Sequence, residues 1–151
     1  MHDDADFTEF VTFIIAGQMF GLPIARVRDV FKPARITRVP LAAAEIAGVL
    51  NLRGRIVTAI DMRRRLEVKR HEQGDASMAI GIEAKGESFG FLVDAVGEVL
   101  KLPEAQRESN PINLDRKLAA LSAGIYRLDD QLLVMLDIDR VLDLRAEPAA
   151  A

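Results

Sequence analysis

The N-terminal part of the chain alternates between two sets of side chains, which is the pattern of a β-strand. In residues 7–15, nearly every side chain is β-branched or aromatic. A two-residue period places successive side chains on opposite faces of a sheet. Gly17-Gln18 then predicts a turn into a second strand, and Gly86-Glu87 predicts a similar turn later in the chain. We therefore expect a hairpin at each place.

Two short apolar runs, 56–60 and 132–136, have the length of buried strands. Asp61 and Asp137 follow them, and an aspartate at this place can cap a helix. We expect short helices at 62–66 and 138–142, and a third that opens at Pro40 and runs over 40–46. The segments 24–31 and 93–100 fit a helical turn or a bent strand equally well.

Two groups of motifs occur twice in the same order. Residues 20–30 resemble residues 89–99, because both read Phe-Gly, three mainly apolar residues, two spacer residues and Val-x-acid-Val. Residues 48–66 resemble residues 124–142 in the same way, from a glycine through Asp to a final leucine. The spacing is longer in the second half, and the polar stretch 103–115 is the natural place for that insertion.

We interpret the chain as a single domain, 1–151, built of two similar units at roughly 7–66 and 78–144. A polar loop at 67–75 joins the units. Chance agreement within an aliphatic sequence is the alternative. Short strands at regular spacing, with small helices at the joints, predict a mainly β protein made of two small barrels or sandwiches.

Composition narrows the classes of function. Of the 151 residues, 50% are hydrophobic and 28% charged, which suffices for one core. The net charge of −3 gives no general field for nucleic acid phosphates or anionic lipid. The absence of cysteine excludes disulfides, thiolate metal sites and cysteine nucleophiles, and suits a reducing cytoplasm. We expect a soluble protein with no secretory signal, no direct membrane insertion and no nucleic acid partner.

Residues suited to catalysis are scarce. His2 and His71 both lie in polar stretches, so a histidine-based triad or metal cage has little to build from. Asp61 and Asp137 could form a carboxylate pair, but helix capping is the favoured interpretation. The basic run 63–65 is interpreted as a solvated surface. We therefore expect no enzyme activity, no cofactor and no metal.

Residues 46–63 resemble the CheW family pattern of G-V-x-N-L-R-G, an apolar strand and D-L-R. Residues 20–24 and 27–30 are similar to that family's F-G-I-x-I and V-x-E-I motifs, and residues 38–40 fit its strand ending in proline. The resemblance runs from about residue 7 to residue 144. Asp29 departs from the usual glutamate and Met62 from the usual leucine.

The resemblance implies a pair of five-stranded SH3-like β-barrels with a hydrophobic seam between them. It also implies a non-enzymatic adaptor that binds the cytoplasmic tip of a chemoreceptor and the regulatory domain of the histidine kinase CheA. Such a protein would lie in the cytoplasm, at receptor arrays on the inner membrane. The alternatives are an adaptor for pili motility or second-messenger output, and a small β-barrel enzyme or ligand-binding domain.

Partner contacts carry over from the family to five positions: Val27, Asp29, Gly48, Arg53 and Val99. Arg53 matches the family's coupling arginine, and we expect it to form an ion pair with Asp29. Both valines could instead be core residues, and Gly48 could be a turn that requires positive φ. We expect the receptor to bind an apolar groove at the seam between the units, and the kinase to bind elsewhere.

Overall fold

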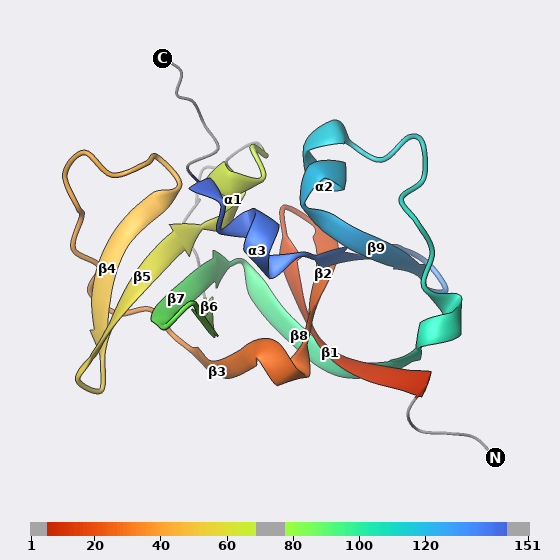
Figure 1. The fold of residues 1–151 in the computed structure, drawn as a ribbon, viewed down its shortest axis with the longest axis horizontal. Helices are drawn as coiled ribbons and strands as arrows, with labels where there is room; N and C mark the ends of the chain where they lie inside the picture. Colours follow the sequence, from red (N-terminus) through yellow and green to blue (C-terminus); the bar gives the residue numbers. More distant parts are fainter. Residues whose placement is uncertain (1–5, 69–77, 145–151) are drawn as a thin grey trace.

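Ten strands form two five-stranded sheets in a computed structural model of the chain, which describes residues 6–68 and 78–144 (Figure 1). The strands are β1 (Phe7–Ile15), β2 (Gln18–Pro23), β3 (Val27–Phe31), β4 (Ile46–Leu52), β5 (Arg55–Asp61), β6 (Met78–Ala84), β7 (Glu87–Val93), β8 (Ala95–Pro103), β9 (Ser122–Arg127) and β10 (Leu132–Leu136). The helical elements are α1 (Met62–Arg65), α2 (Arg116–Leu121), α3 (Ile138–Val141) and the 3-10 turns η2 (Ile24–Arg26) and η3 (Glu104–Gln106). The prediction of a mainly β protein with two five-stranded subdomains is confirmed.

Each sheet takes strands from both halves of the chain. We call the order β8-β1-β2-β10-β9 sheet A and the order β3-β6-β7-β5-β4 sheet B. Sheet B is built from the continuous segment 27–93, whereas sheet A combines 7–23 with 95–136. The boundaries of the two sheets along the chain therefore differ from those of the sequence units 7–66 and 78–144. The reason is pairing at long range: β1 pairs with β8, and β3 pairs with β6, both antiparallel.

One isolated bridge extends each sheet. After β3, Thr37 bridges Val49 of β4, with both N–H to O distances at 2.8 Å. After β8, Glu108 bridges Ile125 of β9, with both distances at 2.9 Å. In each sheet, the segment that follows one edge strand is thereby hydrogen-bonded to the strand at the opposite edge. Continuous ladders join neither β3 to β4 nor β8 to β9 within the described ranges, so closure into a barrel stays a prediction.

A hydrophobic cluster that we call the shared core lies between the sheets. Sheet A supplies Phe13, Ile15, Phe20 and Leu22, and sheet B supplies Ile60, Ile80, Ile82 and Phe91, all at most 1% exposed. Each sheet also has a smaller cluster of its own: sheet B around Leu50 and Val57, and sheet A around Phe10 and Tyr126. Because burial of apolar area drives folding, the shared core joins the two sheets into one folding unit.

The predicted hairpins and helix caps are confirmed. β1 pairs with β2 and β6 pairs with β7, each through a tight turn. Asp61 Oδ1 accepts from the N–H groups of Arg63 and Arg64, and Asp137 Oδ1 accepts from that of Arg140. The ambiguous segment 24–31 combines both options, since η2 leads directly into β3.

Two local predictions differ from the structure. The helix expected at 40–46 is wrong: residues 40–45 form turns, and β4 begins at Ile46. Leu41 has φ of 64°, which lies outside the helical region and stops a helix after Pro40. α2 was not predicted, although Asp115 caps it by accepting from Lys117 N–H. Of the predicted loop 67–75, residues 69–75 lie outside the described part of the chain.

We expect Asp137→Ala to lower the free energy of unfolding by about 1 kcal/mol, because the first turn of α3 loses its cap. Asp137→Asn is the matched control, since its amide oxygen can still accept the same hydrogen bond. Chemical denaturation measures both. Equal losses in the two variants would contradict capping and assign the effect to the carboxylate charge.

Candidate partner-binding surface

The five predicted contact residues lie on three parts of the two sheets. Val27 and Asp29 are in β3, at one edge of sheet B, and Val99 is in β8, at one edge of sheet A. Gly48 is in β4 at the other edge of sheet B, and Arg53 is in the turn between β4 and β5. The structure therefore does not gather the five residues into one cluster.

The two valines both lie at the rim of the shared core. Val27 is half-buried and packs against that core. Val99 continues a row of paired residues through Val11 to Leu22, a member of the shared core, and remains 49% exposed because β8 is an edge strand. Directly paired side chains share one face of a sheet. Val27 thus extends the shared core to the surface, Val99 lies on the same sheet face as Leu22, and neither valine is fully buried.

Further apolar side chains are exposed near these edge strands. Ile24 in η2 and Val30 in β3 are each 40% exposed. η2 packs against β1, the strand next to β8. We call Ile24, Val27, Val30 and Val99 the rim surface. Sequence reasoning identified Val27 and Val99 but missed Ile24 and Val30. Val30 pairs with Ile80 of the shared core and stays partly exposed because β3 is an edge strand.

Asp29 pairs with Arg55 and not with Arg53, so the predicted Asp29–Arg53 ion pair is wrong. Asp29 Oδ2 lies 3.8 Å from Arg55 Nη2. Asp29 Oδ1 is buried without a hydrogen bond, against Gly81 on the neighbouring strand β6. Arg53 and Gly54 form a two-residue turn with φ of 54° and 84°. Such a turn places its first residue at the tip of the hairpin, while Arg55 begins the next strand.

Gly48 has a structural role that is visible in the backbone. Its φ is 148°, and an added Cβ would lie 2.3 Å from the carbonyl oxygen of Thr37. That oxygen accepts from Val49 N–H in the bridge that ties the end of β3 to β4. Close backbone approach therefore requires glycine here. The sequence expectation of positive φ is met within a strand rather than in a turn.

Two of the three arginines in the run 63–65 make specific side-chain contacts within the fold, and Arg63 is buried, which corrects the surface interpretation. The side chain of Arg63 is 11% exposed and makes a bidentate ion pair with Asp94: Nε to Oδ1 is 3.0 Å and Nη2 to Oδ2 is 2.7 Å. Arg65 donates to the carbonyl oxygens of Val141 and Arg140, at 2.7 and 2.9 Å. Arg64 is exposed. Nothing in the local pattern distinguishes the three residues.

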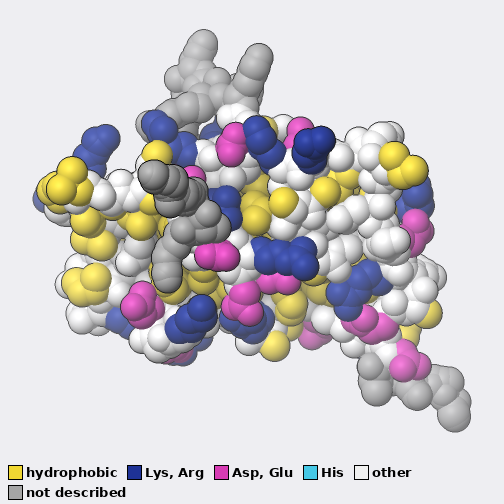
Figure 2. Space-filling model, turned by 45° about the horizontal axis from the view of Figure 1, so that its top comes forward, with side chains coloured by type: hydrophobic (Ala, Val, Ile, Leu, Met, Phe, Trp, Pro, Cys, Tyr) yellow, Lys and Arg dark blue, Asp and Glu magenta, His cyan; other side chains and the backbone are white. Residues whose placement is uncertain are grey.

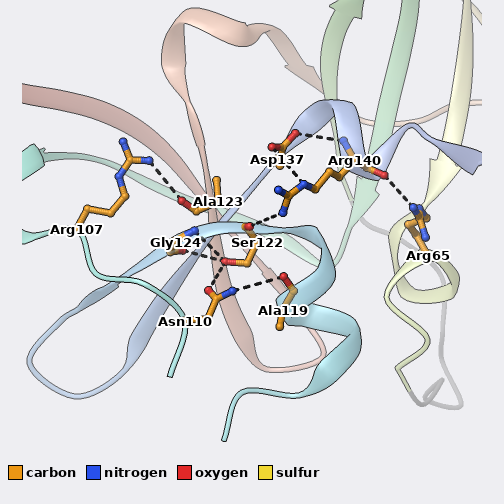
Figure 3. Close-up of polar contacts among 9 residues, drawn as sticks. All are labelled: Arg65, Arg107, Asn110, Ala119, Ser122, Ala123, Gly124, Asp137 and Arg140. Atoms are coloured by element: carbon orange, nitrogen blue, oxygen red, sulfur yellow. Dashed lines mark hydrogen bonds and ion pairs between the residues drawn. The ribbon is translucent and has the colours of Figure 1, made fainter. Parts of the chain in front are cut away.

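A polar groove of about 520 Å³ lies between the loop after η3, the start of β9 and α3 (Figure 3). Ser122 Oγ donates to Asn110 Oδ1 at 2.7 Å, and Arg140 Nη1 donates to the Ser122 carbonyl at 3.2 Å. Glu104 accepts from the Thr8 hydroxyl and from Arg107, and these contacts hold the pKa of its carboxyl below the usual value. The side chains of Glu104, Arg107, Asn110, Ser122 and Arg140 in this groove all have hydrogen-bond partners within the protein.

The described residues contain no group of three or more histidines or acids that could hold a metal. His2 and His71 lie outside the described part. On the face drawn in Figure 2, basic and acidic side chains are interspersed rather than gathered into patches of one sign. In the ranges 6–68 and 78–144, every helix is too short to cross a bilayer.

The chain is similar to known proteins over nearly its whole length. The family model of the CheW-like domain matches residues 9–146. Chemotaxis protein CheW of Thermotoga maritima is 31% identical over 135 residues, covering 89% of this chain and 87% of that protein. The Bacillus subtilis protein of the same name is 28% identical over 142 residues, covering 94% and 91%.

A solved structure is also similar over nearly the whole chain. The crystal structure of the scaffolding protein TtCheW from Thermoanaerobacter tengcongensis has a TM-score of 0.79 and 29% sequence identity. The match covers 93% of this chain and 90% of that one. With a family model that spans both sheets and a relative of the same architecture, the chain belongs to the CheW-like domain family.

Proposed function

We propose that the protein is a non-enzymatic adaptor of chemotaxis signalling, which holds the cytoplasmic tip of a chemoreceptor and the regulatory domain of CheA together. The names of its relatives, which are chemotaxis proteins and a scaffolding protein, support this role. The observation that carries it is the rim surface, where apolar side chains from the edges of both sheets remain exposed. The proposal places the protein in the cytoplasm, at receptor arrays on the inner membrane.

The rim surface is the proposed receptor site. A helical hairpin presents an apolar stripe along each helix, and such a stripe is usually bound by laying it into an apolar groove. Val27 packs against the shared core, Val99 lies on the same face of sheet A as Leu22 of that core, and Ile24 and Val30 are each 40% exposed. Because these residues come from both sheets, a helix bound here would contact sheet A and sheet B at once.

The tip of the β4–β5 hairpin is the proposed site of the second partner. Arg53 is exposed there and forms no ion pair with any acid of the described residues. It follows β4, whereas the rim surface takes its residues from η2, β3 and β8. An adaptor that binds two proteins at once needs two surfaces, and we assign Arg53 and the rim surface to different partners. An unpaired arginine at a protein surface can form bidentate contacts with a carboxylate of a partner.

A scaffold is a better fit than an enzyme. The polar groove near η3 has its charged groups paired with one another: Arg107 with Glu104 at 2.7 Å, and Arg140 with Asp137 at 3.7 Å. A catalytic site usually keeps a base or nucleophile in a strained or unpaired environment. The groove lacks such a group among its lining residues, so we assign no reaction to it.

We expect Arg53→Ala to melt within about 2 °C of the unchanged protein but to weaken the receptor–adaptor–kinase assembly about thirtyfold. Arginines at interfaces are frequent hot spots, and truncation of one typically costs about 2 kcal/mol of binding free energy. Arg64→Ala is the matched control, since Arg64 is also exposed but lies on α1.

Melting temperature and receptor-stimulated kinase activity decide the outcome. Full kinase stimulation by Arg53→Ala would remove this residue from the coupling surface. Absence of stimulation by the unchanged protein, tested with the receptor and kinase of its own organism, would contradict the proposed function itself.

A further inference from the structure

The chain passes between the two sheets at two places, and only one of them carries an ion pair between the described residues. From sheet A to sheet B it runs through η2, between Pro23 and Val27. From sheet B back to sheet A it passes through Asp94, the single residue between β7 and β8. The side chain of Asp94 is bound by Arg63, whereas the matching position of the first crossing is Ala25.

The side chain of Asp94 connects three parts of the chain: α1, the turn between β1 and β2, and the crossing on which Asp94 itself lies. Arg63 comes from α1, which follows β5 of sheet B, and contacts both carboxylate oxygens. Asp94 Oδ2 also accepts from the N–H of Ala16, in the turn between β1 and β2 of sheet A, at 2.8 Å. One carboxylate thus fixes a helix of one sheet, a turn of the other and the crossing between them.

A second arginine of α1 also connects this helix to sheet A. Arg65 donates through Nε and Nη2 to the last carbonyls of α3, the helix that follows β10 of sheet A (Figure 3). A cation at the C-terminal end of a helix satisfies carbonyls that have no partner within the helix. Figure 1 shows α1 and α3 side by side between the two sheets. Arg63 and Arg65 therefore both link α1 to sheet A.

Ion pairs and hydrogen bonds restrict the relative orientation of the two sheets, which apolar packing in the shared core does not do by itself. Burial of apolar area is non-directional, so a hydrophobic seam can be well packed at more than one angle between the sheets. A bidentate arginine–carboxylate pair has a fixed planar geometry. The pair is largely shielded from water, with Arg63 at 11% and Asp94 at 25% side-chain exposure, so salt screens it less than a surface pair.

We propose that the Arg63–Asp94 pair, assisted by Arg65, is a latch that sets the angle between sheet A and sheet B. Arg63 and Asp94 are positioning residues. The consequence for signalling rests on the proposed function: a receptor bound at the rim surface and a second partner bound at the β4–β5 turn keep a fixed mutual orientation only while the latch is closed. Because the rim surface takes residues from both sheets, loss of the latch should weaken receptor binding, whereas the β4–β5 turn lies within sheet B and should still bind its partner.

Two variants open the latch in different ways. Asp94→Asn removes the charge but keeps an oxygen for the Ala16 N–H, and Arg63→Lys keeps the charge but cannot make the bidentate contact. Arg64→Lys, on the same helix but exposed, is the matched control. Residual dipolar couplings of backbone amides in the full chain report the relative orientation of the segments that form the two sheets. Binding of a soluble receptor fragment and of the kinase regulatory domain is measured separately, followed by receptor-stimulated kinase activity.

For the unchanged protein and Arg64→Lys, one alignment tensor should fit both sheets. For Asp94→Asn and Arg63→Lys, the two sheets should need different tensors. The affinity for the kinase regulatory domain should stay within about threefold, while receptor affinity and kinase stimulation should each fall about tenfold. A single unchanged tensor in both variants would overturn the latch. If Asp94→Asn does not fold, Arg63→Lys decides. If the unchanged protein binds neither partner, the proposed function fails, while the couplings still decide whether the latch sets the angle.

Discussion

Phe13→Ala is expected to lower the free energy of unfolding by about 3–5 kcal/mol, the range for truncating a buried phenylalanine. Phe13 has no exposed surface and belongs to the shared core. Its ring stacks on that of Phe20, with 5.9 Å between the centroids. Truncation therefore removes apolar contacts with both sheets and leaves a cavity that the two sheets cannot both collapse to fill.

Phe7→Ala is the matched control for Phe13→Ala, because Phe7 is in the same strand but 41% exposed. Its ring lies 5.5 Å from Lys101 Nζ, a contact of small value at an exposed site. We expect a loss of less than about 1 kcal/mol. Urea denaturation followed by circular dichroism measures both variants. Similar losses at the two positions would show that the shared core does not hold the sheets together.

Gly48→Ala is expected to lower the free energy of unfolding by about 3 kcal/mol or more, since backbone strain and a steric clash both contribute. A Cβ at this position would lie 2.3 Å from the Thr37 carbonyl oxygen and 2.8 Å from Ile36 Cγ2. The backbone φ of 148° adds strain for any residue with a Cβ. To relieve the clash, the chain after β3 must move away from β4, which breaks the bridge between Thr37 and Val49.

Gly17→Ala separates the two causes of this loss. Gly17 also has positive φ, 82°, but an added Cβ there meets open space. Only the backbone strain remains, which costs about 1 kcal/mol. Thermal melts of both variants are compared with the unchanged protein. If the melting temperature of Gly48→Ala is no lower than that of Gly17→Ala, the close approach to Thr37 does not contribute to stability. A direct partner contact would then explain better why glycine occurs at position 48.

Local features of the fold could be predicted from sequence, whereas the pairing of distant strands could not. Alternation in β1, the glycine turns and the caps at Asp61 and Asp137 depend on neighbouring residues, and the structure has all of them. The pairing of β3 with β6 depends on hydrogen bonds between segments far apart in the chain. A repeat in the sequence reveals that two units have the same parts, but not which unit each strand joins.

For the candidate site, too, some residues could be predicted from sequence, whereas contacts between distant segments could not. Val27 and Val99 were identified through a family pattern; Val27 packs against the shared core, and Val99 shares a face of sheet A with Leu22 of that core. The partner of Asp29 was assigned to Arg53 because both match family positions, yet the hairpin register brings Arg55 within 3.8 Å instead. Arg63 was interpreted as solvated, since a short basic run gives no sign that one member is buried against Asp94. Such contacts follow from the packing of two sheets, which no local pattern encodes.

The order in which the ribosome releases the chain has a consequence for folding, because sheet B is one uninterrupted segment enclosed by the two parts of sheet A. Sheet B has all its strands once residue 93 has emerged. The hairpin of β1 and β2 is synthesised first, yet its neighbours β8 and β10 arrive last. Its two edges stay unpaired through most of synthesis, and unpaired edges invite association with other chains. We therefore expect vectorial folding to begin with the inner segment, and β1, which precedes the other strands along the chain, to be among the last to pair fully.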